Sequence, residues 1–161
     1  MIVVDANVLA FYLIEGKRTT EAKALREKDA EWIVPVFWSV EFQSILWKYV
    51  RLDGMPMGKA AELLDHALAM FSANEMTPPP HMVLRDAIDW GITVYDAQYV
   101  SLARHLGIRC VTEDRSVQKA CPSVALSLNA FLSDSSSGGV VREAPAPYRT
   151  RKRTSRHRFK H

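Results

Sequence analysis

Four carboxylates stand where a strand or a turn passes into a helix: Asp5, Glu41, Asp96 and Asp114, in VVDANVL, WSVEFQSIL, VYDAQYVSLA and CVTEDRSV. An acid at the C-terminal end of a parallel strand points into the crevice where open α/β sheets bind ligands. Four ionised acids in one crevice would repel one another, and an oxygen-preferring divalent cation such as Mg²⁺ or Mn²⁺ relieves that repulsion. The arrangement predicts metal-dependent cleavage of phosphodiester bonds.

Each of these acids also has a purely structural explanation. Asp96 and Asp114 suit the first turn of a helix, where negative side chains interact favourably with the macrodipole, and Glu41 could be a solvated helix residue. Asp5 is harder to explain in this way, because an ionised group behind the apolar Ile2–Val4 is costly to bury unless it is paired or bound to a metal. The four acids together favour the functional explanation.

Short apolar runs alternate with helical patterns along most of the chain. We expect five strands, at Ile2–Val4, Glu31–Val34, Asn74–Thr77, Ile108–Thr112 and Val124–Leu126. We expect helices between them, at about 6–14, 19–28, 36–52, 57–71, 81–90, 96–106, 114–120 and 129–132. This alternation predicts an α/β fold with a central, mostly parallel sheet and helices on both faces.

Two of the expected helices have apolar faces that we assign to the core. In the helix over 36–52, the spacing predicts that Val40, Ile45, Leu46 and Tyr49 face inward. In the helix over 57–71, the stripe that begins at Met57 and ends at Phe71 is typical of core packing.

The composition is typical of a globular cytoplasmic protein with no membrane partner. The chain has 161 residues, of which 48% are hydrophobic and 24% charged. Cys110 and Cys121 lack the spacing of a metal site, and we expect neither zinc nor a disulfide. The apolar N-terminus has no basic start and is interrupted by Asp5, so it does not resemble a signal peptide, and no run is as long as a membrane span.

The net charge of +3 conceals a difference between two parts of the chain. Residues 1–132 carry 13 basic and 16 acidic side chains, whereas residues 133–161 carry eight basic and two acidic ones. The second part opens with SDSSSGG and ends with RTRKRTSRHRFKH, a composition that cannot bury enough apolar area to order itself. We expect a nuclease domain over 1–132 and a disordered basic tail over 133–161, which could contact phosphates non-specifically.

The four acidic motifs resemble those of PIN-domain ribonucleases, and most closely those of VapC-type toxins of type II toxin–antitoxin systems. The resemblance covers residues 1–132, and YDAQYVSLA followed by VTED is its most specific part, although Ala6 stands where many members have Thr. It implies a three-layer PIN-like sandwich and a homodimer. It also implies a cognate VapB-type antitoxin and endonucleolytic cleavage of RNA that depends on Mg²⁺, with Mn²⁺ as a substitute.

The resemblance also assigns roles to individual residues. The catalytic and metal-binding carboxylates would be Asp5, Glu41, Asp96 and Asp114. The residues expected to orient carboxylates or water are Asn7, Thr112 and Ser39. Independently of the resemblance, the basic residues that could surround the acidic site are Lys17, Arg18, Lys48, Arg51, Arg85, Arg104 and Arg115. Those near the expected active-site loops, and therefore expected to bind RNA, are Lys17, Arg18 and Arg115.

Other functions fit the sequence less well. A catalytically inactive PIN-like module that binds RNA or protein is the main alternative, and the presence of all four acids argues against it. A haloacid-dehalogenase-like phosphatase requires a second Asp where this chain has Asn7, and a receiver domain requires an acidic pair and a lysine that are not evident. The five histidines have no motif spacing, which disfavours a metal-free ribonuclease.

Overall fold

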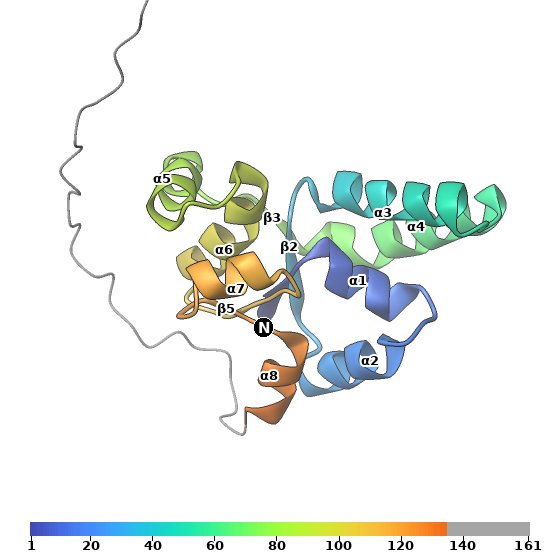
Figure 1. Ribbon diagram of the computed structural model, residues 1–161, viewed down its shortest axis with the longest axis horizontal. Coiled ribbons are helices and arrows are strands. Elements are labelled where there is room, and N and C mark those ends of the chain that lie inside the picture. Colours follow the sequence, from blue (N-terminus) through green and yellow to red (C-terminus); the bar gives the residue numbers. More distant parts are fainter. Residues whose placement is uncertain (135–161) are drawn as a thin grey trace, which may run out of the picture.

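The computed structural model describes residues 1–134, which form a five-stranded, wholly parallel sheet in the order β3-β2-β1-β4-β5 (Figure 1). The strands are β1 Ile2–Val4, β2 Trp32–Pro35, β3 Glu75–Met76, β4 Cys110–Val111 and β5 Ala125–Leu126. This confirms the α/β prediction and sharpens it, since no strand of the described chain is antiparallel. The predicted basic tail lies, from residue 135 onward, outside the described residues.

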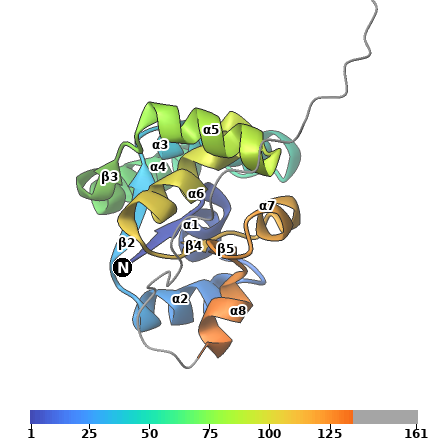
Figure 2. The same cartoon turned by 90° about the vertical axis from the view of Figure 1, so that its left-hand side faces the viewer.

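Eight α-helices and one short 3₁₀ helix connect and cover the strands within residues 1–134 (Figures 1 and 2). They are α1 Ala6–Leu13, α2 Thr19–Lys28, α3 Trp38–Leu52, α4 Met57–Phe71, η1 Ser72–Asn74, α5 Pro80–Trp90, α6 Val94–Leu106, α7 Arg115–Ala120 and α8 Leu128–Ser133. None of these helices is long and apolar enough to cross a membrane.

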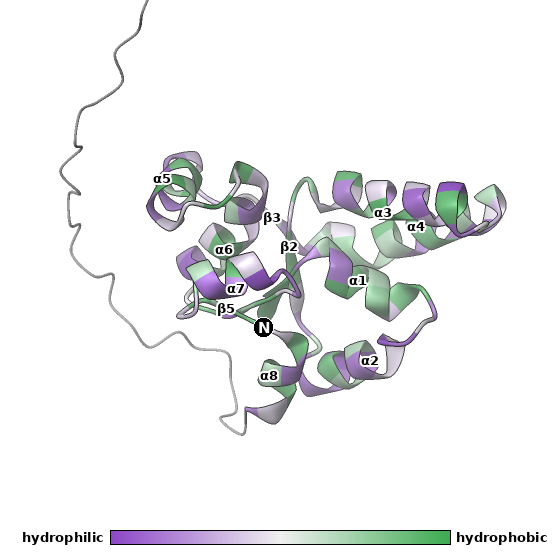
Figure 3. Cartoon of the chain, viewed as in Figure 1, coloured by the Kyte–Doolittle hydropathy of each residue, from purple (hydrophilic) through white to green (hydrophobic). Residues whose placement is uncertain are grey.

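The two faces of the sheet have separate hydrophobic cores because side chains alternate along each strand. Ile2 and Val4 of β1 pack with α1–α4 and α8, whereas Val3 packs with α6 and α7 on the opposite face. In Figure 3 the strands are largely green, while the helices carry green and purple stretches, as expected for helices that bury one side. The result is the predicted arrangement of helices on both faces of the sheet.

Helices α5 and α6 pack against each other, and the turn that connects them sets the position of Asp96. Asp86 of α5 is 1% exposed, accepts a hydrogen bond from Ser101 Oγ at 2.7 Å and pairs with Arg104 of α6 at 2.7 Å. Gly91 ends α5 with a φ of 66°, a left-handed conformation that side chains other than glycine rarely adopt. The turn after Gly91 then leads into α6, so Asp96 follows a helix and a turn rather than a strand.

Two predictions about helix faces are wrong. Val40 is 61% exposed, because α3 packs inward through the ridge that contains Trp38, Phe42 and Leu46, and Val40 lies on the far side of that ridge. Met57 is 69% exposed, because it begins α4 at the end remote from the sheet. Phe71, at the other end of that stripe, is fully buried as predicted.

Candidate active site

The strand order places a ligand-binding crevice at the C-terminal ends of β1 and β4. The chain runs outward from β1 through β2 to β3, then crosses back to place β4 on the other side of β1. Ligands of open α/β sheets bind at such a reversal of strand order. Asp5 directly follows β1, and Thr112 directly follows β4, so both lie at this point.

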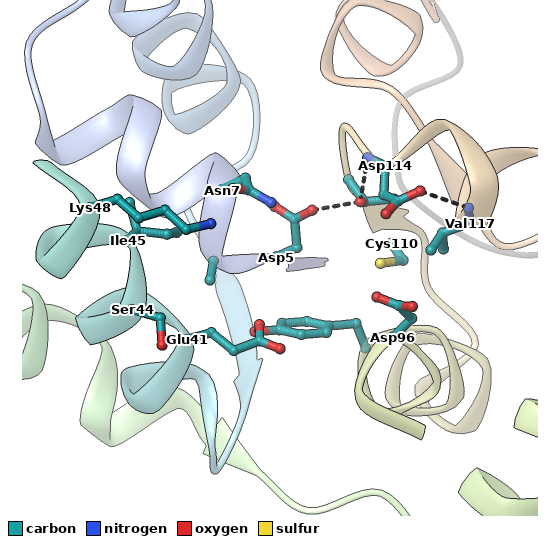
Figure 4. A pocket seen from close by; sticks show the side chains of 13 residues that line it. Asp5, Asn7, Glu41, Ser44, Ile45, Lys48, Asp96, Cys110, Asp114 and Val117 are labelled. Carbon is teal, nitrogen blue, oxygen red and sulfur yellow. Dashed lines mark hydrogen bonds between the residues drawn. The ribbon is translucent and has the colours of Figure 1, made fainter. Parts of the chain in front are cut away.

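A cavity of about 250 Å³ opens here, and all four predicted carboxylates line it (Figure 4). Asp5 comes from the β1–α1 junction, Glu41 from α3, Asp96 from the first turn of α6 and Asp114 from the β4–α7 junction. Figure 4 shows the side chains of Asp5, Glu41, Asp96 and Asp114 around one central space. Four segments that are distant in sequence are therefore brought together as the motifs predict.

Asp5 is the most deeply buried of these acids, with only 7% of its surface exposed. One carboxylate oxygen caps α1 by accepting from the Val8 N–H at 2.8 Å, and the other accepts from the Thr112 hydroxyl at 2.5 Å. Burial disfavours the charged form and raises the pKa of Asp5 to about 6, although both hydrogen bonds act in the opposite direction. Asp5 is thus held rigidly in a position where its charge is poorly solvated.

Glu41 lies opposite Asp5 and is held by a tyrosine. The Tyr99 hydroxyl donates to Oε2 of Glu41 at 2.6 Å, and the Tyr99 ring packs edge-on against Phe37 at 5.7 Å. Burial, followed by the charges of Asp5 and Asp96, raises the pKa of Glu41 above its usual value. All three of these carboxylates line the same cavity.

Asp96 and Asp114 are each tied to the start of their own helix. The Thr93 hydroxyl donates to Oδ2 of Asp96 at 2.6 Å. Asp114 caps α7 through Oδ1, which accepts from the Ser116 N–H at 2.7 Å, and the Ser116 hydroxyl holds the pKa of Asp114 below its usual value. Both acids therefore stabilise the first turn of a helix, as the structural explanation proposes, and both also line the cavity wall.

The side chains of the cavity suit a hard divalent cation. Carboxylate oxygens dominate the donor set, and the Cys110 thiol in the wall is fully buried with its pKa well above the usual value. Within residues 1–134 no three candidate ligands already converge closely enough to form a cation cluster.

The residues predicted to orient carboxylates differ in where they lie. Thr112 is 3% exposed and links the two strand ends, since its hydroxyl donates to Asp5 and accepts from the Asp114 N–H at 3.1 Å. Asn7 also lines the cavity, on the side of α1. Ser39 is half-buried on α3 but does not line the cavity.

None of the three basic residues predicted to bind RNA lines this cavity. The Arg18 guanidinium is occupied by Glu21 at 2.6 Å and by Glu113 at 2.7 Å, and it lies over the Phe11 ring. Lys17 and Arg115 are exposed.

Tyr99 and Lys48 also line the cavity; the sequence did not single out Tyr99, and it named Lys48 only among the basic residues that could surround the acidic site. Tyr99 follows Asp96 by one helical turn, a spacing that places both on one face of α6. Lys48 follows Glu41 by two turns on α3. Helical spacing from each predicted acid was the signal that would have identified them.

The sequence matches the model of the PIN domain over residues 2–121. This chain belongs to the PIN-domain family. Among its relatives, Ribonuclease VapC3 of Pyrobaculum aerophilum is 28% identical over 127 residues, covering 76% of this chain and 96% of that protein. Exonuclease VapC9 of the same organism is 38% identical over 77 residues, covering 48% of this chain and 57% of that protein.

Solved structures share the PIN fold of this chain. The crystal structure of PAE2754 from Pyrobaculum aerophilum superimposes with a TM-score of 0.65 at 25% identity, covering 81% of this chain and 85% of that one. The crystal structure of FitAcB from Neisseria gonorrhoeae has a TM-score of 0.63 at 13% identity, covering 80% of this chain and 98% of that one. The resemblance inferred from the four acidic motifs is thereby confirmed at the level of family and fold.

Proposed function

We propose that this PIN-domain protein is a Mg²⁺-dependent endoribonuclease and the toxin of a toxin–antitoxin pair. The observation that carries the proposal is the meeting of Asp5, Glu41, Asp96 and Asp114 around one cavity at the reversal of strand order. Membership of the PIN-domain family and the similarity to a protein named Ribonuclease VapC3 support it.

The carboxylates have distinct parts in this proposal. Asp5 and Asp96 would be the direct ligands, and Glu41 and Asp114 would complete the site directly or through water. Bound Mg²⁺, for which Mn²⁺ would substitute, lowers the pKa of water and stabilises charge on the oxygens of the phosphodiester. Thr112 and the Val8 N–H hold Asp5 in place, while the Tyr99 hydroxyl holds Oε2 of Glu41. These contacts keep the acids oriented before substrate arrives.

A circular RNA tests the reaction and its endonucleolytic character together. A circle has no ends, so an exonuclease leaves it intact, whereas an endonuclease opens it to a linear molecule. We expect opening with Mg²⁺ or Mn²⁺, none with EDTA, and none with Asp96→Asn under either condition. Products should carry 5′-phosphate and 3′-hydroxyl ends.

A catalytically inactive RNA- or protein-binding module remains the alternative, and the same assay separates it. Degradation of linear but not circular RNA would contradict the endonucleolytic part. Failure to cleave either RNA, together with failure to bind Mn²⁺, would favour the inactive module.

The protein partners belong to the same proposal. We infer a cognate VapB-type antitoxin and a homodimer. Exposed apolar side chains support protein partners, because Trp47 and Met57 of the α3–α4 pair and Leu84 and Ile88 of α5 are all more than half exposed. A small DNA-binding protein encoded beside this gene, which co-purifies with the chain and inhibits its cleavage of RNA, would test the first inference. Light scattering of the purified chain tests the second.

A further inference from the structure

Lys48 lies on the same face of α3 as the predicted metal ligand Glu41. Glu41, Ser44, Ile45 and Lys48 follow one another at intervals of three, one and three residues, a pattern that keeps them on one side of a helix. All four line the cavity, and Figure 4 shows the Lys48 side chain extending toward Asn7 beside Asp5. One helix therefore presents both an acid and a base to the same space.

Lys48 is the one basic residue of residues 1–134 that lines this cavity. Its side chain is exposed, and no acidic group in that part of the chain lies within ion-pair distance of its ammonium. Arg18, by contrast, has its guanidinium occupied by Glu21 and Glu113. The Lys48 ammonium is therefore available to an anionic ligand, and no internal partner has to be displaced.

The backbone of Lys48 is separated from that of Glu41 along the helix. Seven residues at a rise of 1.5 Å place the Cα of Lys48 about 10 Å along α3 from the Cα of Glu41. The Lys48 side chain extends from that position toward Asn7, on the α1 side of the cavity. A strand whose scissile phosphate lies over Glu41 and Asp96 would thus bring a neighbouring phosphate toward Lys48.

We propose that Lys48 binds a backbone phosphate of the RNA adjacent to the phosphate that is cleaved. The proposal rests on the function proposed above and adds a binding contact to it. A negatively charged domain with an acidic cavity repels a polyanion, and a lysine at the edge of that cavity offsets the repulsion where the strand enters. Because a lysine contacts phosphate as a point charge, the contact would position the strand without selecting its bases.

The test measures binding of a labelled single-stranded RNA by fluorescence anisotropy in an Asp5→Asn background, in which the RNA is not cleaved. Adding Lys48→Gln should raise Kd about fivefold at physiological salt and reduce the slope of log Kd against log salt by about 0.7, the value for one lost phosphate contact on a single strand. Lys48→Arg should restore both. Lys59→Gln is the matched control, since Lys59 is an exposed lysine of α4 that lines a different hollow.

Two results of the RNA-binding measurement would overturn the proposal. One is an unchanged Kd and salt slope in Lys48→Gln, and the other is an equal effect of Lys59→Gln, which would mean that only net charge matters. A third measurement, of Mn²⁺ affinity in the otherwise wild-type chain, should show less than a twofold change for Lys48→Gln. A tenfold loss would show that Lys48 supports the carboxylates instead of the substrate. Failure of the wild-type chain to cleave RNA would refute the proposed function, but the RNA-binding measurement would still show whether Lys48 contacts a phosphate.

Discussion

Replacing Asp5 with Asn should stabilise the protein when no divalent cation is present. Burial raises the pKa of Asp5 from 3.8 to about 6, so the ionised carboxylate disfavours the folded state. Because the folded-state pKa is the higher one, the stabilising contribution of protonated Asp5 is complete below pH 3.8 and is lost as pH rises through 6. A pKa difference of about 2, at about 1.4 kcal/mol for each unit, corresponds to about 3 kcal/mol.

The substitution retains part of the local hydrogen bonding. The Asn oxygen can still accept from the Val8 N–H that caps α1, but the Asn NH₂ group then faces Thr112, so the hydrogen bond to Thr112 must reverse, with the amide donating to the Thr112 oxygen. We therefore expect a net gain of about 2 kcal/mol at pH 7.5, which for a domain of this size raises Tm by about 6 °C.

Urea unfolding between pH 4 and pH 8 in EDTA measures the effect. The difference between Asp5→Asn and wild type should grow from pH 4 to pH 6 and then level off. Asp65→Asn, on the exposed side of α4, should show no such pH-dependent gain. If Asp5→Asn were less stable than wild type at pH 7.5, or if the stability difference did not depend on pH, burial would not destabilise the ionised Asp5 carboxylate as argued. Mn²⁺ should stabilise wild type and leave Asp5→Asn unchanged.

Two further substitutions test how the acids are held. Thr112→Val removes the hydroxyl that donates to Asp5, so the midpoint of pH-dependent Mn²⁺ binding should move about one pH unit upward. Isothermal titration calorimetry across pH 5 to 8 measures this midpoint. An unchanged midpoint would contradict the role of this hydrogen bond. Tyr99→Phe removes the hydroxyl that donates to Glu41 and should weaken Mn²⁺ binding about tenfold with little change in Tm. Tyr95→Phe, which alters an exposed ring, is the control and should leave Mn²⁺ binding intact. Equal losses in both variants would show that the Tyr99 hydroxyl does not hold Glu41.

Much of the fold follows from local patterns. Met57–Phe71 is predicted to the residue because Pro56 precedes it and its apolar spacing is helical throughout. Gly91 and Gly107 end α5 and α6, and both adopt the left-handed φ that glycine tolerates best. The predictions fail where packing between distant segments determines which helix face is buried. Val40 has an apolar side chain but lies outside the ridge that α3 buries.

The candidate site shows the same division. The four acids are recognisable because each stands at the start of a helix in a motif of its own. Tyr99 was missed because its role depends on α6 lying across the cavity from Glu41, a contact between residues 58 positions apart. Arg18 was assigned to RNA from its position in a loop near the site, but the fold brings Glu113 against it.

Anomalous diffraction from a crystal of the protein soaked in Mn²⁺ tests the central claim most directly. We expect a peak in the cavity within coordination distance of Asp5 and Asp96, with Glu41 and Asp114 around it. Mn²⁺ bound elsewhere, or a cavity without a peak while the same solution supports RNA cleavage, would contradict the assignment of these carboxylates as the metal-binding site.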